Sequence, residues 1–463
     1  MHCGPVLTEL LGSQSCARDY ATASLVVTQP RERALEALDL CHVRGRAGGG
    51  FPVAHKWWIV AREQSEPKYF ICNITAVQPG SFKERFLINA NSHSIVESVI
   101  IATYLCAARL GLICISSCLE TEATLLQSAL AEAYECGYLG DNALRSGHSI
   151  DVQLVRAANA YVAGEETALM ECIEGRQPQP RGKPPLPTRR GLGGQPTAVN
   201  NLESLLQARY ALRVGHRAYR SLGVETAPGT MVFSLSGDVR RPGLYELPLG
   251  TTARELVFEH GLGLQNGDHL QAIIPGISSP IIPANKIDTP LEFESMRDIG
   301  SSLGSGCVMV LAGERCMASF TAYVADFFSK NSCGKCAPCA QGTTRAHRLL
   351  MNLDRLDQAA INGAGSSKGP HPNSPFTIIG NRPGISYTDT VKGLTKIDYL
   401  CEFFKYRGDC HYSTEAANSI QSLVKNFEAD FDFHVNGGHC KGIAHSGSRA
   451  PATSGAAVCG ALP

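Results

Sequence analysis

The sequence predicts a multidomain α/β protein, and three observations support this prediction. The chain has 463 residues, 44% of them hydrophobic and 18% charged, which is enough for roughly two to four domains with hydrophobic cores. Strand-like and helix-like segments alternate after residue 50. The pattern changes to short strands near residue 231 and to helices after residue 312. We therefore expect an α/β domain, a small α+β unit and a helical segment, in that order.

The first domain is predicted from segments of two kinds. Residues 68–74 and 113–115 are hydrophobic and rich in β-branched and aromatic side chains, as strands are, whereas residues 94–112 and 125–138 suit helices. Such alternation favours a sheet with helices on both faces. Residues 176–185 contain repeated prolines, which predict an extended loop.

The rest of the chain divides into a β-rich and a helical part. Short strands are predicted at 231–238, 242–246, 270–274 and 308–311, and a helix at 252–259. The predicted domains are an N-terminal arm at 1–30, a first domain at 31–225, a second at 226–311 and a helical domain at 312–437. The helical domain carries a Gly/Ser/Pro-rich insertion near 360–395, and residues 438–463 form a tail with the composition of disordered segments.

Charge and cysteine content limit the partners and the compartment. The 42 Lys and Arg residues balance 42 Asp and Glu residues, so we expect no binding to nucleic acid or to an anionic membrane surface. The apolar stretch 98–108 is interrupted by Arg109 and is shorter than the roughly 20 residues of a membrane span. The chain has 18 cysteines and no secretory signal. We therefore expect the cytoplasm or the mitochondrial matrix, at the periphery of a membrane complex.

The strongest chemical signal is a cluster of three cysteines. Cys333, Cys336 and Cys339 have the C-x2-C-x2-C spacing that lets three thiolates hold corners of a four-iron, four-sulfur cluster. A fourth ligand must come from elsewhere, and Cys401 and Cys410 are the candidates. Zinc bound by four cysteines is the alternative, and buried cysteines without a ligand are a third interpretation.

Four motifs, in a fixed order, resemble a known family. They are RGRAGGGFP at 44–52 followed by Lys56 and Trp57, YVAGEETAL at 161–169, GQPTAVNNLE at 194–203 and SCGKCAPC at 332–339. From about residue 31 to 435 the chain resembles the flavin- and NADH-binding iron–sulfur subunit of respiratory complex I, and its relatives in NAD-linked hydrogenases and formate dehydrogenases. The resemblance implies a Rossmann-like FMN domain, a β-grasp domain and a helical bundle that holds a four-iron, four-sulfur (4Fe–4S) cluster.

The resemblance also implies a reaction and its residues. NADH gives hydride to FMN, which releases single electrons to the cluster and on to other iron–sulfur subunits of a multisubunit complex. It selects Cys410 as the fourth cluster ligand. The sequence identifies no catalytic acid, base or nucleophile. The residues expected to bind cofactors are Gly45, Arg46, Gly48, Phe51, Lys56, Asn73, Gly164, Glu165, Glu166, Lys183, Val199, Asn200 and Asn201.

The residue types suit these roles, and each also has a simpler interpretation. Glycine-rich loops bring backbone amides close to phosphate, but they also form ordinary turns. The side chains of Asn200 and Asn201 can hydrogen-bond a ribityl chain or cap local turns. Glu165 and Glu166 can line a flavin site or complement the dipole at a helix start.

The chain departs from the family at the nucleotide pocket. Thr75, Ala76 and Gln78 stand where the family has acidic residues, each lost hydrogen bond costing roughly 0.5–3 kcal/mol. Ile59 and Leu186 stand where it usually has Phe, each lost aromatic contact costing roughly 0.5–1.5 kcal/mol. We therefore predict an iron–sulfur electron-transfer subunit with weakened or lost NADH oxidation. The alternatives are a competent FMN-dependent NADH:acceptor oxidoreductase and a structural paralogue that acts as a scaffold.

Overall fold

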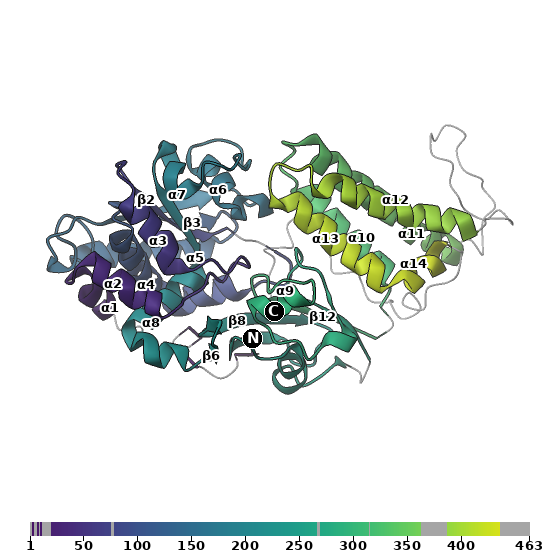
Figure 1. Ribbon diagram of the computed structural model, residues 1–463, viewed down its shortest axis with the longest axis horizontal. Helices are drawn as coiled ribbons and strands as arrows, with labels where there is room; N and C mark the ends of the chain where they lie inside the picture. Colours follow the sequence, from purple (N-terminus) through teal and green to yellow (C-terminus); the bar gives the residue numbers. More distant parts are fainter. Residues whose placement is uncertain are drawn as a thin grey trace.

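The computed structural model describes residues 20–75, 78–265, 269–313, 315–362 and 387–435, together with 2–3, 7–8 and 10–11. Its elements form three groups, a layered α/β part, a mixed sheet below it and a set of long helices at the far end (Figure 1). The predicted tail at 438–463 and the centre of the predicted insertion lie outside the described residues.

The first group is built on a parallel sheet of four strands in the order β4-β3-β2-β5. Because every pair is parallel, all four carboxyl ends lie at one edge of the sheet. The strand order reverses between β2 and β5, since β3 and β4 continue on the other side of β2. The strands are β2 (Tyr69–Ile74), β3 (Leu110–Ser116), β4 (Asp151–Ala157) and β5 (Thr197–Asn201).

Helices cover both faces of this sheet, because consecutive side chains of its central strands are apolar and point to opposite faces. In β2, Phe70 and Cys72 pack into the core shared with the larger helices, whereas Ile71 packs with Leu169 and Met170 of the opposite face. The larger helices are α2 (Arg31–Leu40), α3 (Val53–Arg62), α4 (Lys83–Leu105), α5 (Glu120–Glu135) and α8 (Leu202–Arg220), and the opposite face carries α6 (Glu166–Ile173) and α7 (Pro187–Arg190).

Several local predictions differ from the structure. The helix expected at 125–138 forms at Glu120–Glu135. The helix expected at 94–112 begins earlier and ends at Leu105, because residues 110–112 pair with both β2 and β4. The last part of the predicted arm at 1–30 is folded. Residues 21–27 form α1 (Ala21–Val27), whose side chains Ala23, Val26 and Val27 are buried in the core of the first group.

The second group is a mixed sheet of six strands in the order β1-β9-β8-β12-β10-β11. Strands β8 and β12 are parallel, β8 and β9 antiparallel, and β10 is antiparallel to both of its neighbours. A core of its own includes Phe233, Tyr245 and Val310. The strands are β1 (His2–Cys3), β8 (Thr230–Gly237), β9 (Gly243–Pro248), β10 (Leu270–Ile274), β11 (Ile282–Pro283) and β12 (Cys307–Ala312), with a helical turn at Glu255–His260 and α9 (Phe293–Asp298) beside them; β6 (Gly223–Val224) and β7 (Ala227–Pro228) form a separate short pair.

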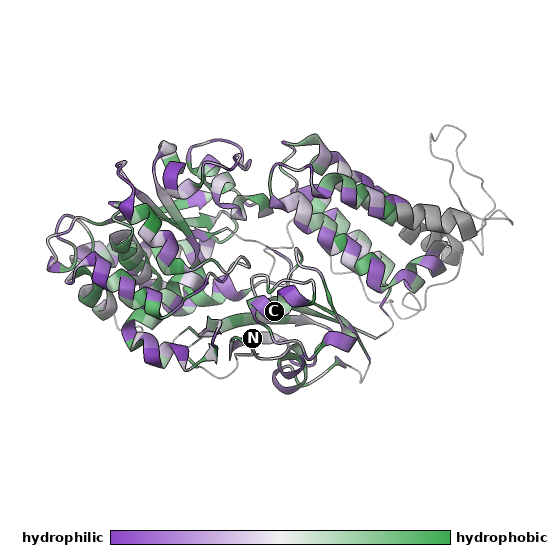
Figure 2. Ribbon diagram, in the orientation of Figure 1, coloured by the Kyte–Doolittle hydropathy of each residue, from purple (hydrophilic) through white to green (hydrophobic). Residues whose placement is uncertain are grey.

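The third group is helical. Its helices carry hydrophobic and hydrophilic bands in alternation (Figure 2) and share a core that includes Phe328, Phe404 and Phe431. Gly342 lets two of them approach closely, because a Cβ atom there would lie 2.4 Å from the Phe404 ring. In the described part of the chain, no helix is both long and apolar enough to cross a membrane. The helices are α10 (Met317–Asn331), α11 (Ala337–Asn362), α12 (Tyr387–Lys405), α13 (His411–Asn426) and α14 (Glu428–Val435).

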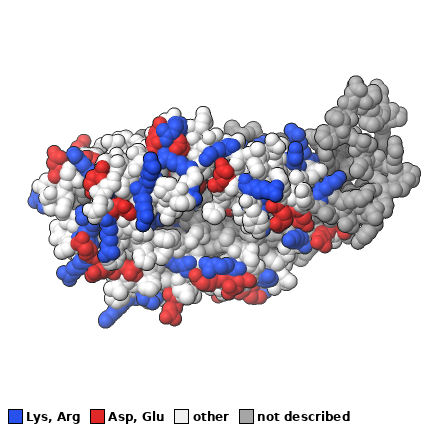
Figure 3. All heavy atoms as spheres, turned by 45° about the horizontal axis from the view of Figure 1, so that its top comes forward, with Lys and Arg blue, Asp and Glu red and all other residues white. Residues whose placement is uncertain are grey.

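A buried ion pair joins the first two groups. Lys83 Nζ lies 2.6 Å from Glu203 Oε2, and each side chain is only 1% exposed. Lys83 also donates to the Ser305 carbonyl, and Glu203 Oε1 accepts the Val232 N–H at 2.8 Å. On the outer face shown in Figure 3, by contrast, acidic and basic side chains are interspersed.

Candidate functional site

The predicted cofactor residues gather at the carboxyl edge of the parallel sheet. Asn73 is the last residue but one of β2, and Asn200 and Asn201 end β5. In the register of these two strands, Cys72 pairs with Asn200 and Asn73 pairs with Asn201. This is the place where the strand order reverses, and ligands of open α/β sheets bind in the crevice outside such a point. The sheet therefore places these three residues where a cofactor is expected.

The Asn73 amide is largely engaged within the protein. Its Nδ2 donates to the Gly164 carbonyl at 2.9 Å, and its Oδ1 accepts the Thr75 N–H at 3.0 Å. The Thr75 hydroxyl lies 2.6 Å from the same oxygen. A carboxamide has two acceptor and two donor positions, and the described residues use one of the donors, so Asn73 has a second N–H to offer a ligand. It also ties the end of β2 to the segment that holds Glu165.

The two neighbouring asparagines differ in their free groups. Asn201 is the N-cap of α8, because its Oδ1 accepts the Ser204 N–H at 3.2 Å. Asn200 Oδ1 accepts the indole N–H of Trp57 at 2.9 Å. Among the described residues, no hydrogen-bond partner lies at the Asn200 amide nitrogen, which leaves two donors for a ligand.

The glycine loop folds as a tight hairpin. The Gly45 N–H donates to the Phe51 carbonyl at 3.0 Å, and Gly48 and Gly50 have φ values of 108° and 60°, which favour glycine. Arg46 points inward and is fully buried. Its guanidinium donates to the Thr230 and Pro228 carbonyls at 3.0 and 3.1 Å, so its side chain fastens the loop to the second group.

Four charged side chains form a cluster beside the loop. Lys183 Nζ lies 2.9 Å from Glu165 Oε1 and 2.7 Å from Glu166 Oε1, and Lys56 Nζ lies 3.9 Å from Glu166 Oε2. Burial and the nearby Lys183 charge lower the pKa of Lys56, although Glu166 opposes this shift. Lys56 also donates to the Val199 carbonyl at 3.0 Å. The two lysines and the two glutamates balance in charge, and Lys56, at 3.9 Å from Glu166, is paired less closely than Lys183, so it is the better placed of the two to meet a phosphate.

Glu165 has two roles in this cluster. It is the N-cap of α6, since its Oε2 accepts the Thr167 and Ala168 N–H groups at 2.9 Å. Burial raises the pKa of Glu165, but hydrogen bonds from Thr167 and Lys183 outweigh burial and hold it below the ordinary value. Glu165 therefore does stabilise the start of α6, as the simpler interpretation of this residue expects.

Apolar side chains border the same region. Phe51 and Leu186 are 50% and 55% exposed, and Ile59 on α3 is exposed as well. Lys56 Nζ lies 6.0 Å from the centre of the Phe51 ring. Exposed apolar surface near a crevice is typical of ligand sites. Here, one aromatic ring and two aliphatic side chains are available to contact a planar ligand.

Thr75 and Gln78, which stand where the family has acidic residues, form hydrogen bonds with other parts of the chain. The Thr75 hydroxyl also lies 2.8 Å from the Ala163 carbonyl, and the Gln78 amide donates to Ser305. Ala76 lies outside the described residues. At 75 and 78, therefore, neutral side chains that make internal hydrogen bonds stand in place of carboxylates.

The four predicted cluster cysteines come together at two helix starts. Cys333 and Cys336 precede α11, Cys339 lies in its first turn, and Cys410 is the N-cap of α13. Burial raises the pKa of Cys339 to about 12, and the thiols of Cys336, Cys410 and Cys333 raise it further through their proximity. Helix N-termini favour anions, so two helix dipoles support negative sulfur at this point.

The alternative ligand, Cys401, lies apart from this group. It is fully buried in α12, where burial raises its pKa to about 12 and the charges that act on it are those of Asp398, Glu402, Lys405 and Lys425. Cys410, in contrast, is half-buried, and the charges of Cys333 and Cys336 act on it. The fold thus brings Cys410, rather than Cys401, to the three-cysteine motif.

The chemistry of the four thiols suits a metal centre. Buried thiols with raised pKa values need a cation to become thiolates, and both cysteine-bound zinc and a four-iron cluster supply one. Among the described residues, no group of three or more His, Cys, Asp or Glu side chains is placed to hold a metal ion as it stands. The C-x2-C-x2-C spacing of the first three thiols is the feature that favours an iron–sulfur cluster.

The part of the chain that carries the four cysteines contacts two segments next to the predicted cofactor residues, the proline-rich loop and the start of the Glu165 segment. Lys335, inside the motif, donates to the Pro180 carbonyl at 2.7 Å, and Gln179 Nε2 donates to the Cys333 carbonyl at 3.3 Å. The Tyr161 ring, at the start of the Glu165 segment, packs edge-on against Phe327 and lies 6.1 Å from Tyr412. Sequence reasoning did not single out these contacts, although Gln179 and Pro180 lie in the proline-rich loop.

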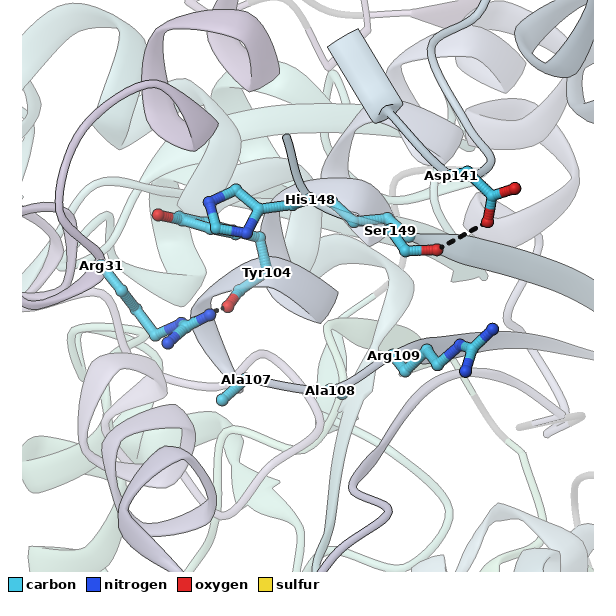
Figure 4. Close-up of a pocket in the computed structure, with 9 residues that line it drawn as sticks. Arg31, Tyr104, Ala107, Ala108, Arg109, Asp141, His148 and Ser149 are labelled. Carbon is cyan, nitrogen blue, oxygen red and sulfur yellow. Dashed lines mark hydrogen bonds between the residues drawn. The ribbon is translucent and has the colours of Figure 1, made fainter. Parts of the chain in front are cut away.

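A hollow of about 460 Å³ lies at the opposite edge of the sheet. Arg31, Tyr104, Arg109, His148 and Ser149 line it (Figure 4), and the Arg31 guanidinium donates to the Tyr104 carbonyl at 2.6 Å. Since Arg109 precedes β3 and Ser149 precedes β4, this hollow lies at the amino ends of the strands. It contains none of the predicted site residues.

Comparison with known proteins gives the family. The sequence model described as the Nuo51 FMN-binding domain matches residues 38–209, and that of the NADH-ubiquinone oxidoreductase-F iron–sulfur binding region matches residues 319–362. The chain is 34% identical to the F 2 subunit of NADH-quinone oxidoreductase from Rhizobium meliloti (strain 1021), over 88% of this chain and 89% of that protein. The chain belongs to the family of NADH-quinone oxidoreductase F subunits.

Another member of this family and a solved structure agree with the assignment. The NADH-quinone oxidoreductase F subunit of Rickettsia felis (strain ATCC VR-1525 / URRWXCal2) is 35% identical over 90% of this chain and 92% of that protein. The fold is similar to a chain of the NAD+-reducing [NiFe]-hydrogenase in the H2-reduced state, with a TM-score of 0.77 and 25% identity over 93% of this chain and 67% of that one. The predicted family, with its FMN-binding and 4Fe–4S-binding regions, is confirmed.

Proposed function

We propose that this chain is an iron–sulfur electron-transfer subunit in which Cys333, Cys336, Cys339 and Cys410 hold a 4Fe–4S cluster. The observation that carries the proposal is the meeting of two helix starts, α11 and α13, at these four thiols. The matched iron–sulfur region, which includes the first three cysteines, supports it.

The flavin part of the proposal rests on the carboxyl edge of the parallel sheet. Asn200 offers two amide donors, Asn73 offers one, and Lys56 supplies positive charge beside the glycine loop. When bound, FMN supplies the conversion of a hydride into single electrons, and the cluster supplies a one-electron carrier. The chain itself orients the flavin by these donors and joins the two sites through Tyr161 and the contact of Lys335 with Pro180.

In this proposal the chain binds NADH with lower affinity than other members of the family do. The polar groups of Thr75 and Gln78 form hydrogen bonds within the protein, so no carboxylate accepts ribose hydroxyls at those positions. The retained Lys183 and the exposed Phe51 ring still suit a dinucleotide. The competent oxidoreductase therefore remains the second candidate function.

The broader architecture completes the proposal. The six-stranded mixed sheet acts as a β-grasp unit, and helices α10–α14 act as the bundle that carries the cluster. Cys333, Cys336, Cys339 and Cys410 would hold a single cluster within this chain, which would supply one-electron transfer to an iron–sulfur centre of a partner subunit. The relatives are named as parts of NADH-quinone oxidoreductases, which supports a multisubunit partner.

One set of measurements separates the candidates. The full chain, purified anaerobically, should contain iron and sulfide in the ratio of a four-iron, four-sulfur cluster, together with FMN. NADH should then bleach the flavin absorbance only at concentrations at least about tenfold above those needed by a triple variant Thr75→Asp, Ala76→Glu, Gln78→Glu. Equal NADH affinity of the two proteins would favour the competent oxidoreductase. Zinc in place of iron, or no metal, would refute the proposed cluster.

A further inference from the structure

A thiol–imidazole pair lies at the start of α10, apart from the cluster cysteines. Cys316 is the N-cap of this helix, and its Sγ lies 2.9 Å from Nε2 of His434 in α14. Both side chains are buried, with exposed fractions of 8% and 3%. Helix α10 has 15 residues, which at 1.5 Å per residue places the pair roughly 20 Å from the cysteine motif that follows the helix.

The surroundings of the sulfur favour its negative form. The Ser319 N–H and hydroxyl lie 3.3 and 3.2 Å from Cys316 Sγ, so the sulfur accepts hydrogen bonds there. The helix start adds a positive dipole end, and an imidazolium beside the sulfur adds a proton donor. Burial alone would favour the neutral thiol. Three polar contacts on one sulfur at a helix N-terminus oppose this effect.

Two charged side chains of the described part of the chain lie near the pair. Asp430 Oδ2 accepts the Met317 N–H at 3.2 Å, and burial raises the pKa of Asp430. Arg315, which precedes the cysteine, is paired with Asp238 at 2.6 Å. Among the described residues, His434 is therefore the side chain that is placed to exchange a proton with the sulfur.

We propose that Cys316 is a modification site for small peroxides, with His434 as its proton donor. The thiolate sulfur attacks one oxygen of hydrogen peroxide, an S–O bond forms and the O–O bond breaks. Sulfur is oxidised by two electrons and the peroxide is reduced. The departing hydroxide takes a proton from His434 and leaves as water, so that the products are a sulfenic acid and neutral imidazole. With 8% of its surface exposed, Cys316 can be reached by a molecule as small as hydrogen peroxide but not by a bulky disulfide.

The consequence of this modification lies in α14. The added oxygen must occupy the buried space between Cys316 Sγ and His434 Nε2, which is filled at a separation of 2.9 Å. Because α14 contacts α10 through this pair and through Asp430, oxidation should loosen its attachment. This effect does not depend on the proposed flavin or cluster residues.

The chain contains a matched reference thiol. Cys136 is exposed and lies at the C-terminal end of α5, where the helix dipole disfavours a thiolate. The full cluster-containing protein is treated briefly with hydrogen peroxide at several pH values and quenched with catalase. It is then unfolded, labelled with N-ethylmaleimide and digested, and mass spectrometry measures the blocked fraction of each cysteine.

We expect Cys316 to be oxidised about tenfold faster than Cys136 at pH 6, despite its burial. Between pH 6 and 8 its rate should rise less than about fivefold, whereas that of Cys136 should rise at least about 30-fold, as the thiolate of an ordinary cysteine does. In His434→Asn the pH profile of Cys316 should become as steep as that of Cys136. His434→Gln, which keeps a donor but no charge, should behave like His434→Asn.

The proposal is overturned by either of two results in the wild-type protein. In one, Cys136 is oxidised while Cys316 stays intact at every pH. In the other, the rates of the two cysteines rise equally steeply with pH. Both results are measured on the wild-type protein, so they do not depend on whether the His434 variants fold.

Discussion

The buried pair of Lys83 and Glu203 allows a quantitative test of how the first two groups are joined. In Glu203→Gln the amide oxygen can still accept the Val232 N–H, so the substitution chiefly removes a negative charge. Burial lowers the pKa of Lys83, but Glu203 at 2.6 Å outweighs burial and raises it. Without that partner, the described groups left near the buried ammonium are the Ser305 carbonyl, the more distant Glu84 and the Cys307 thiol.

The expected loss is large because both side chains are almost completely inaccessible. Breaking a buried pair by removing one partner costs about 3–5 kcal/mol in the free energy of unfolding. With urea slopes of roughly 2–3 kcal/mol per molar, the unfolding midpoint should fall by about 1–2 M. The double variant Lys83→Met, Glu203→Gln should recover most of this loss, because neither charge is then buried and the Val232 N–H keeps its acceptor. A loss below about 1 kcal/mol in Glu203→Gln would refute the reasoning.

Three further predictions concern the proposed cluster ligands, the asparagines at the end of β5 and Glu415, a buried carboxyl group in α13. Cys410→Ala should lose the iron–sulfur absorbance while Cys401→Ala keeps it; loss in both, or in neither, would contradict the assignment. Asn200→Ala should lower FMN occupancy about tenfold at limiting flavin, whereas Asn201→Ala should mainly cost about 1 kcal/mol of stability as a lost helix cap, measured by urea unfolding. Burial raises the pKa of Glu415 from 4.5 to about 7, so the folded chain stays protonated where the unfolded one ionises. Stability should therefore fall by roughly 1 kcal/mol per pH unit from pH 4.5 to 7, and Glu415→Gln should flatten that slope; an unchanged slope would show that Glu415 is not responsible.

Local patterns in the sequence predicted much of the fold. Residues 270–274 form β10 as expected, and residues 68–74 and 231–238 match β2 and β8 to within one residue. These segments are apolar over a strand's length, so the signal lies in neighbouring residues. The helix expected at 94–112 was wrong at its end, because only pairing with two other strands assigns residues 110–112 to β3.

The sequence by itself determined the family and predicted four cluster cysteines, three from the C-x2-C-x2-C spacing and Cys410 from the resemblance, because these patterns are contained in short stretches of chain. Only the tertiary structure placed Cys410 beside the other three, turned Arg46 inward and made Asn201 a helix cap, while Asn200 keeps donors that no described residue uses. It also created the pair of Cys316 and His434, which are 118 residues apart. Such properties depend on hydrogen bonds and burial between distant segments, and no local pattern contains them.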